Sequence, residues 1–194
     1  MEYEGKRMQT KKEDIRNRIL TVSEKSFIKN GYSDTSLNMI AGACSISKSN
    51  IYRYFRSKEE IYETIVGPAR QSIMKLIRRF GSKEYSGNYT EDKINEVSDV
   101  LAKVMSEYRS GILIMLKSGE RKEQEAIRAA MSDFFVAGCP LRDKEFKKQV
   151  ASLMMTAYID ILLNCREEDE MRHRLWMLHS YHYLGLTGIK RREI

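Results

Sequence analysis

The chain has 194 residues, with 34 lysines and arginines against 27 aspartates and glutamates, and its length fits one large domain or a small domain joined to a medium one. Two prolines and eleven glycines are roughly half of average usage, too few for the turns of a sandwich or barrel, so an all-α fold of long helices is expected. Most of the net charge of +7 lies in residues 1–58, with twelve basic and six acidic residues, as expected where one module meets a polyanion. On charge alone, a solvated basic tail remains the alternative.

The N-terminal segment is predicted to begin with two helices. Apolar residues recur near the 3.6-residue period over residues 11–30, and the pair Asn30-Gly31 supplies a helix stop. Thr35 or Ser36 can then cap a short second helix that ends near residues 44–45.

A third helix, capped by Ser47, is predicted to run to about Phe55. Two short helices joined by a turn of three or four residues form a helix-turn-helix, whose second helix fits a DNA major groove about 12 Å wide. With Ile51 as the buried anchor and a turn of 100° per residue, Ser49 and Arg53 point away from the core. The same geometry puts Asn50 and Tyr52 on the two flanks. It also predicts four residues on or beside the core side: Ser47, Lys48, Tyr54 and Phe55. The exposed face therefore offers an amide, a guanidinium and a phenol, groups suited to bases and phosphates.

A fourth, longer helix is predicted to connect the N-terminal segment to the rest of the chain. Residues 57–60, Ser-Lys-Glu-Glu, followed by Ile61, are typical of a capping box at a helix start. The pair Gly67-Pro68 predicts a bend in this helix, because proline removes one backbone hydrogen bond and crowds the preceding turn.

The remainder, residues 59–194, is predicted to form a second helical domain, for a total of about nine helices. Its last helix is apolar on two faces, with Trp176 and Tyr183 beside the main stripe. Such a helix usually packs internally on one face and meets a partner on the other. Residues 142–165 and 169–184 are therefore predicted to form a homodimer interface.

Five short strings stand close together in the N-terminal segment: Thr35-Ser36-Leu37, Ile40-Ala41, Ile46-Ser47-Lys48, Ile51-Tyr52-Arg53-Tyr54-Phe55 and Ser57-Lys58-Glu59. Together they resemble the signature of the TetR/AcrR family, over about residues 11–65. The resemblance implies a dimeric transcriptional regulator, usually a repressor, that a small ligand releases from a palindromic operator. It also implies that Thr35 or Ser36, Tyr52 and Lys58 contact phosphates and that the exposed face of the third helix reads bases. The complete expected DNA-binding set is Thr35, Ser36, Ser47, Lys48, Ser49, Asn50, Tyr52, Arg53 and Lys58.

The sequence departs from the family pattern at two places. Where the family usually has Ala-Gly in the turn, this chain has Cys44-Ser45, and where the family has Gly-Thr in the recognition helix, it has Ser49-Asn50. A left-handed conformation at Ser45 would cost on the order of 1 kcal/mol relative to glycine. The second departure changes side chains that face the groove, so it bears on the operator sequence.

A small, largely apolar effector is expected in the C-terminal domain, mainly on the strength of the resemblance. Eight methionines after residue 67 suit an adaptable pocket, although they also suit plain core packing. They are Met74, Met105, Met115, Met131, Met154, Met155, Met171 and Met177. An alternative is a TetR-like DNA-binding factor controlled by a partner protein, and a closed cavity would count against it.

No catalysis, cofactor or metal site is expected. The sequence shows neither a nucleophile motif nor a paired carboxylate site nor a phosphate loop. His173, His179 and His182 have spacings that can share a helix face, but no matching carboxylate accompanies them, so core or interface histidines are the better interpretation. Three widely spaced cysteines fit free thiols in a reducing cytoplasm, and the longest apolar run, residues 112–116, is far shorter than the roughly 18 residues of a membrane span.

Overall fold

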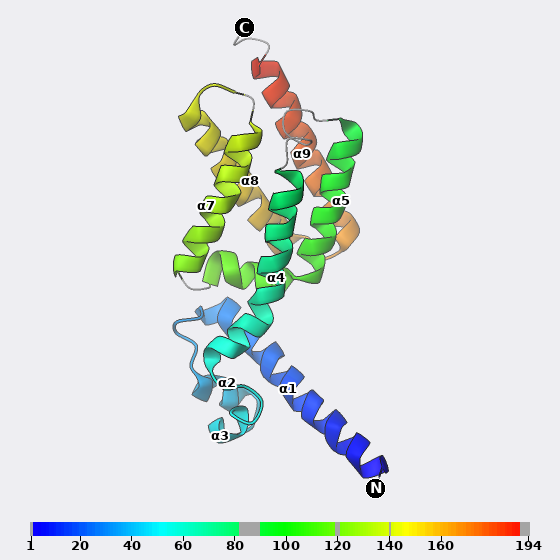
Figure 1. Cartoon of the computed structure of the whole chain (residues 1–194), viewed down its shortest axis with the longest axis vertical. Coiled ribbons are helices and arrows are strands. Elements are labelled where there is room, and N and C mark those ends of the chain that lie inside the picture. Colours follow the sequence, from blue (N-terminus) through cyan, green and yellow to red (C-terminus); the bar gives the residue numbers. More distant parts are fainter. Residues whose placement is uncertain (1, 82–89, 119–120, 140, 191–194) are drawn as a thin grey trace.

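The computed structural model describes residues 2–81, 90–118, 121–139 and 141–190 (Figure 1). Within these ranges the chain forms nine α-helices and one π-helical segment, which confirms the predicted all-α fold. They are α1 (Glu2–Asn30), α2 (Leu37–Ala43), α3 (Lys48–Ile51), α4 (Lys58–Phe80), α5 (Glu91–Glu107), α6 (Arg109–Leu113), η1 (Ile114–Ser118), α7 (Arg121–Gly138), α8 (Lys144–Asn164) and α9 (Glu168–Lys190).

Helix α1 begins well before the predicted residue 11, and Figure 1 shows its N-terminal turns projecting from the molecule. Apolar periodicity could not predict that extension, because residues 2–10 carry no apolar stripe.

Three serines cap the helices of the N-terminal segment, as the sequence predicts. Each hydroxyl accepts a hydrogen bond of 3.2 Å from the backbone N–H three residues further on, at Ser36, Ser47 and Ser57. Helix α1 ends as predicted, because Gly31 has a φ of 86° and donates its N–H to the Phe27 carbonyl. The helix starts and stops are therefore local consequences of the sequence.

Helix α3 is shorter than predicted, since it ends at Ile51 rather than near Phe55. The N–H groups of Tyr54 and Phe55 both donate to the Ile51 carbonyl, at 2.9 and 3.0 Å, so the chain coils on in tight turns before α4. The Phe55 ring is buried, and the Arg16 guanidinium of α1 lies 5.0 Å from its centroid. Burying Phe55 against α1 redirects the chain, and this long-range contact is not visible in the local sequence.

The turn between α2 and α3 places Ser45 in the left-handed region, with a φ of 55°. This conformation matches the expectation for the position where the family usually has glycine. Non-glycine residues pay a steric cost there.

Ser45→Gly should therefore raise the free energy of unfolding by about 1 kcal/mol, because it relieves that steric cost. Ser49→Gly is the matched control, since Ser49 lies within α3, where glycine should lower stability by roughly 0.5 to 1 kcal/mol. Denaturant unfolding of the two variants measures both effects. A Ser45→Gly protein no more stable than the wild type would disprove the strain.

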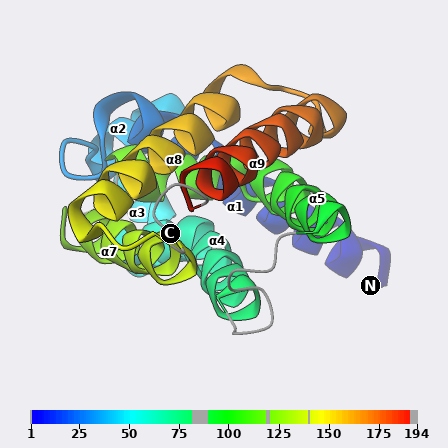
Figure 2. The ribbon, with the colours of Figure 1, turned by 90° about the horizontal axis from the view of Figure 1, so that it is seen from above.

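One continuous apolar core connects the two ends of the molecule. It runs from Ile19 and Phe27 of α1 to Met171 and Leu175 of α9. Helix α5 packs along α9, and α7 packs along α8. Seen from above, α4 lies between α5 and α7, with α8 and α9 on the other side (Figure 2).

Helix α4 joins the N-terminal segment to this bundle, and Figure 1 shows it changing direction along its length. Pro68 lies inside the helix, as expected for a bend. Helix α6 crosses α4 at the same level, where a Cβ added to Gly111 would lie 2.8 Å from both the Ile65 carbonyl oxygen and the Ala69 Cβ. The two helices thus make a backbone-to-backbone contact that only glycine permits.

Candidate functional site

The outer face of α3 and the turn after it forms an exposed polar surface. Ser49 and Arg53 are exposed and Tyr52 is half-exposed, whereas Ile51 is fully buried beneath them. Asn50 is partly buried on the flank. The predicted orientation of the recognition helix is therefore present in the structure.

Two residues of this surface differ from the predicted geometry. Ser47 and Lys48 were expected on or beside the core side, but both are exposed. Ser47 precedes α3 as its cap, and the helix has only four residues, so a continuous helical wheel does not apply at its start. Both side chains therefore add to the exposed polar face.

The paired hydroxyls at the start of α2 have different environments. Thr35 is buried, and its Oγ1 lies 2.7 Å from the Gly31 carbonyl and 3.2 Å from the Ser26 carbonyl. Ser36 is exposed and caps α2. Of the two alternatives for a phosphate contact, Ser36 is the one on the surface.

Lys58 is directed at the loop between α1 and α2. Its Nζ donates to the carbonyls of Tyr32 and Thr35, at 2.7 and 2.9 Å, and lies 4.2 Å from the centroid of the Tyr32 ring. In the expected phosphate contact, the ammonium would exchange part of this network for a phosphate oxygen.

An aromatic cluster at the base of α4, missed in the sequence, holds the same loop. The Tyr32 and Tyr62 rings pack with centroids 4.6 Å apart, and Phe27 contacts both. The Tyr32 hydroxyl donates to Glu59 Oε1 at 3.0 Å, and hydrogen bonds from backbone, Ser57 and Tyr32 hold the pKa of Glu59 below its usual value. The helix-turn-helix is thereby joined to the first turns of α4.

Some of the twelve basic residues in residues 1–58 have described side chains. Those of Lys6, Arg7 and Lys11 lie outside the described residues. Arg53 and Arg56 are exposed beside the α3 face. Cations therefore flank the polar groups suited to reading bases.

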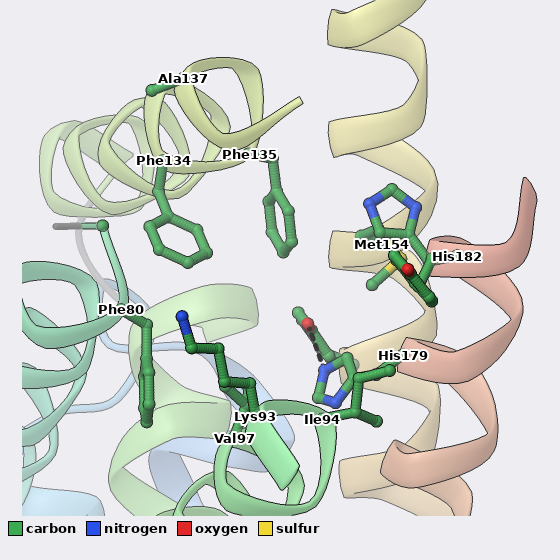
Figure 3. Close-up of a pocket in the computed structure, with 13 residues that line it drawn as sticks. Phe80, Lys93, Ile94, Val97, Phe134, Phe135, Ala137, Met154, His179 and His182 are labelled. Carbon is green, nitrogen blue, oxygen red and sulfur yellow. Dashed lines mark hydrogen bonds between the residues drawn. The ribbon is translucent and has the colours of Figure 1, made fainter. Parts of the chain in front are cut away.

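Two adjoining cavities open in the C-terminal bundle, among α4, α5, α7, α8 and α9. Figure 3 shows the larger one. The larger encloses about 110 Å³ and the smaller about 80 Å³. Five side chains bound both cavities: Phe80, Val97, Phe134, Phe135 and Tyr158. Four of the predicted methionines line one or the other, namely Met105, Met115, Met131 and Met154.

A buried hydrogen-bond chain forms one wall of the larger cavity. Ser98 Oγ donates to the Ile94 carbonyl at 2.7 Å and lies 2.8 Å from His179 Nδ1, while His179 Nε2 lies 2.8 Å from the Tyr158 hydroxyl. Because the single Ser98 hydroxyl proton goes to a carbonyl, Nδ1 must donate to Ser98 and Nε2 must accept from Tyr158. Burial, with charge repulsion from His182, lowers the pKa of His179 to about 4. His179 is thus a neutral, fully hydrogen-bonded histidine.

The other two histidines lie apart from this chain. His182 lines the larger cavity, and burial lowers its pKa as well. His173 is exposed and stacks on Trp176, with ring centroids 6.4 Å apart. Within the described part of the chain, no three His, Cys, Asp or Glu side chains are grouped so that they could hold a metal ion.

Known proteins share the helix-turn-helix described above. Residues 19–65 match the family model described as bacterial regulatory proteins, tetR family. Over 160 residues, which span 80% of this chain and 79% of the relative, the sequence is 24% identical to the HTH-type transcriptional regulator UidR of Escherichia coli strain K12. Residues 19–65 therefore form a helix-turn-helix segment of the TetR family.

Sequence identity to known regulators is higher in the N-terminal part than over the longer alignment with UidR. Over 53 residues the chain is 36% identical to the HTH-type transcriptional regulator QacR of Staphylococcus aureus strain Mu50, covering 27% of this chain and 28% of that protein. The fold similarity extends over most of the chain. The crystal structure of a TetR-family transcriptional regulator from Bordetella parapertussis 12822 superposes with a TM-score of 0.61 at 19% identity, covering 86% of this chain and 94% of that one.

The matched segment and the similarity to UidR together support a helix-turn-helix transcriptional regulator of the TetR type. Regulators of the TetR family bind DNA and usually act as dimers. In the residues that the structure describes, no helix is both long and apolar enough to cross a membrane.

Proposed function

We propose that this TetR-family protein is a ligand-responsive repressor that binds a palindromic DNA operator as a homodimer in the cytoplasm. Residues 1–58 bind the operator, and residues 59–194 dimerise and hold the effector. Ser49 and Arg53 read the major groove, with Asn50 at the edge. The phosphates beside it are contacted by Ser36, Ser47, Lys48, Tyr52 and Lys58. The observation that carries the proposal is the exposed polar face of α3, backed by a fully buried Ile51.

The two cavities give a small ligand a place to bind, although both open to solvent and neither is the closed cavity that would count against control by a partner protein. They lie inside the helical bundle that α4 connects to the helix-turn-helix, so their occupant can act on α4 directly. The π-helical segment η1 contributes Met115 and Leu116 to the smaller cavity and packs against α1. A ligand that displaces these side chains therefore has a second route to the DNA-binding helices.

A regulatory rather than catalytic role is also part of the proposal. A serine hydrogen-bonded to a histidine can act as a nucleophile when the histidine takes its proton. Here, however, the Ser98 hydroxyl donates to the Ile94 carbonyl. His179 donates to Ser98 and so cannot accept a proton from it in this arrangement. The hydrogen-bond chain is therefore a wall of the cavity.

Binding to DNA is tested with Lys58→Ala, which should weaken operator affinity about equally for all sequences and lower the salt slope by roughly one ion. The matched control is Lys75→Ala, the same charge change at an exposed site further along α4, and it should leave the slope unchanged. Titrations at several salt concentrations measure both slopes. A Lys58→Ala slope equal to that of the wild type would show that Lys58 only holds the loop between α1 and α2.

The homodimer should form through α8 and α9, where large apolar side chains face solvent. The exposed fractions of Leu153, Tyr181 and Leu184 are 69%, 80% and 68%. Leu184→Glu should therefore convert a dimer to a monomer, because it places a charge in an interface that buries this side chain. Met39→Glu is the control, since Met39 is also exposed but lies on α2. Light scattering at micromolar concentration gives the mass, and a monomeric wild type would rule out this interface.

A further inference from the structure

Helix α6 lies between the DNA-binding helices and the helices of the proposed dimer interface. It contacts α1 and α4 on the DNA-binding side, and it contacts α8 on the side of the interface. Helices α8 and α9 carry the exposed apolar side chains through which two copies are proposed to pair, and α4 leads directly out of the helix-turn-helix. A short helix in this position can fix the orientation of the recognition helix relative to the dimer interface.

Arg109, the first residue of α6, reaches the end of α8. Its Nη1 donates to the Cys165 carbonyl at 2.6 Å, and its Nη2 donates to the Leu163 carbonyl at 3.3 Å. The last carbonyls of a helix have no partner within the helix, and this end attracts positive charge. The planar guanidinium holds both hydrogen bonds in one orientation. Arg109 therefore fastens α6 to the corner where α8 ends and the chain turns into α9.

The opposite side of α6 contacts α4 with no side chain between the two backbones. A Cβ added to Gly111 would lie 2.8 Å from both the Ile65 carbonyl oxygen and the Ala69 Cβ. Ile65 and Ala69 stand on either side of Pro68, at the bend of α4. Because Gly111 is only two residues from Arg109, a shift of the corner between α8 and α9 is carried through α6 to this bend.

A second connection between the same parts runs through α5, which packs along α9 and contacts α4. It consists of packed side chains and of an exposed ion pair between Arg172 and Asp99, with Nε and Oδ1 3.0 Å apart. Packed helices can slide past one another by small amounts, whereas hydrogen bonds from a charged donor are directional. Loss of the Arg109 hydrogen bonds should therefore leave the bundle assembled and loosen its orientation on α4.

We propose that Arg109 is a positioning residue for DNA binding, which sets the spacing between the two recognition helices of the dimer through α6 and α4. The inference rests on the proposed function for the dimer and for its palindromic operator. A dimer must match the separation of its half-sites, about 34 to 36 Å or a multiple of one DNA turn. One added base pair moves a half-site by about 3.4 Å and rotates it by about 35°.

Operators that differ only in the central spacer measure this role. The full-length protein is titrated with the inverted repeat selected from random duplexes, and with duplexes that have one base pair more or one fewer between the half-sites. The wild type should bind the altered spacings roughly a hundredfold more weakly, because several base contacts of one half-site are lost. Arg109→Met should reduce this penalty to roughly tenfold, because the charge-assisted hydrogen bonds no longer hold the spacing.

The ratio of affinities separates positioning from a general loss of structure. A variant that is only partly folded binds all three duplexes more weakly by the same factor, so the ratio stays that of the wild type. Arg166→Met is the matched control, since Arg166 is exposed at the same corner and the change removes the same charge without removing the Arg109 hydrogen bonds. It should keep the wild-type ratio. Light scattering should give the mass of a dimer for each variant.

Arg109→Lys is the milder second variant, because it keeps the charge and loses the planar fork that spans two carbonyls. Its penalty for altered spacing should lie between those of the wild type and Arg109→Met, and it decides the question alone if Arg109→Met does not fold. Wild-type ratios in the folded Arg109 variants would overturn the inference, as would an equal relaxation in Arg166→Met. A wild type that is monomeric, or that binds all three spacings equally, would contradict the proposed dimer and this inference with it.

Discussion

Arg53→Ala should lower operator affinity by about 1 to 3 kcal/mol for each half-site, and by about twice that for the dimer if the half-sites are additive. The guanidinium stands on the exposed face just after α3, where a bidentate contact with guanine is geometrically suitable. The backbone holds this position, because the Arg53 N–H donates to the Asn50 carbonyl at 3.2 Å. Base preference should relax at one position of each half-site, since only one base pair loses its partner.

Affinities for the operator and for a panel of singly substituted operators measure this effect. Arg56→Ala is the matched control, because it removes the same charge three residues away at another exposed position. In Arg56→Ala, affinity should fall by the same factor for every operator sequence, if it falls at all, and the base preferences should stay unchanged. Preferences that stay intact at every operator position in Arg53→Ala would refute the orientation assigned to α3.

Protonation of His179 should lower the free energy of unfolding by about 3 kcal/mol when the pH drops from 7 to about 4. The unfolded histidine binds a proton with a pKa of 6.5, whereas the folded one binds it with a pKa of about 4. Between these values the unfolded state holds more protons, so acid favours unfolding. The loss begins as the pH falls through 6.5 and is complete near 4.

Thermal unfolding between pH 7 and 4.5 tests this dependence. His179→Gln should be less stable at pH 7, because Ser98 and Tyr158 lose their shared partner, but its stability should vary less with pH. His173→Gln is the control, since His173 is exposed and should leave the wild-type pH dependence unchanged. Parallel pH profiles for His179→Gln and the wild type would show that His179 does not titrate as proposed.

Local rules predicted much of the DNA-binding part. Capping needs only a hydroxyl and the next turn of chain, so Ser36, Ser47 and Ser57 could be identified from sequence. The left-handed turn at Ser45 followed from the family pattern of the turn. The family itself was recognisable because its strings cluster within residues 35–59.

Contacts between distant residues were not predictable in the same way. Ser98 and His179 are 81 positions apart, and their hydrogen bond depends on how α5 packs along α9. Ser98 is a polar residue that shares the buried face of α5 with Ile94, Ala102 and Met105, and this was the available sign of a buried partner. The sequence likewise did not indicate that Lys93 lines the larger cavity, because a lysine near a helix start is usually solvated. The loop contacts of Lys58 required the fold of α1 and α2.

The proposed function requires two copies of α3 to read inverted half-sites in DNA. Selection of binding sites from random duplexes by the full-length protein tests this most directly. The predicted result is an inverted repeat whose half-site centres lie about 34 to 36 Å apart, or a multiple of one DNA turn, matching the two recognition helices of a dimer. Enrichment of no sequence, or of a single unrepeated half-site, would contradict the account.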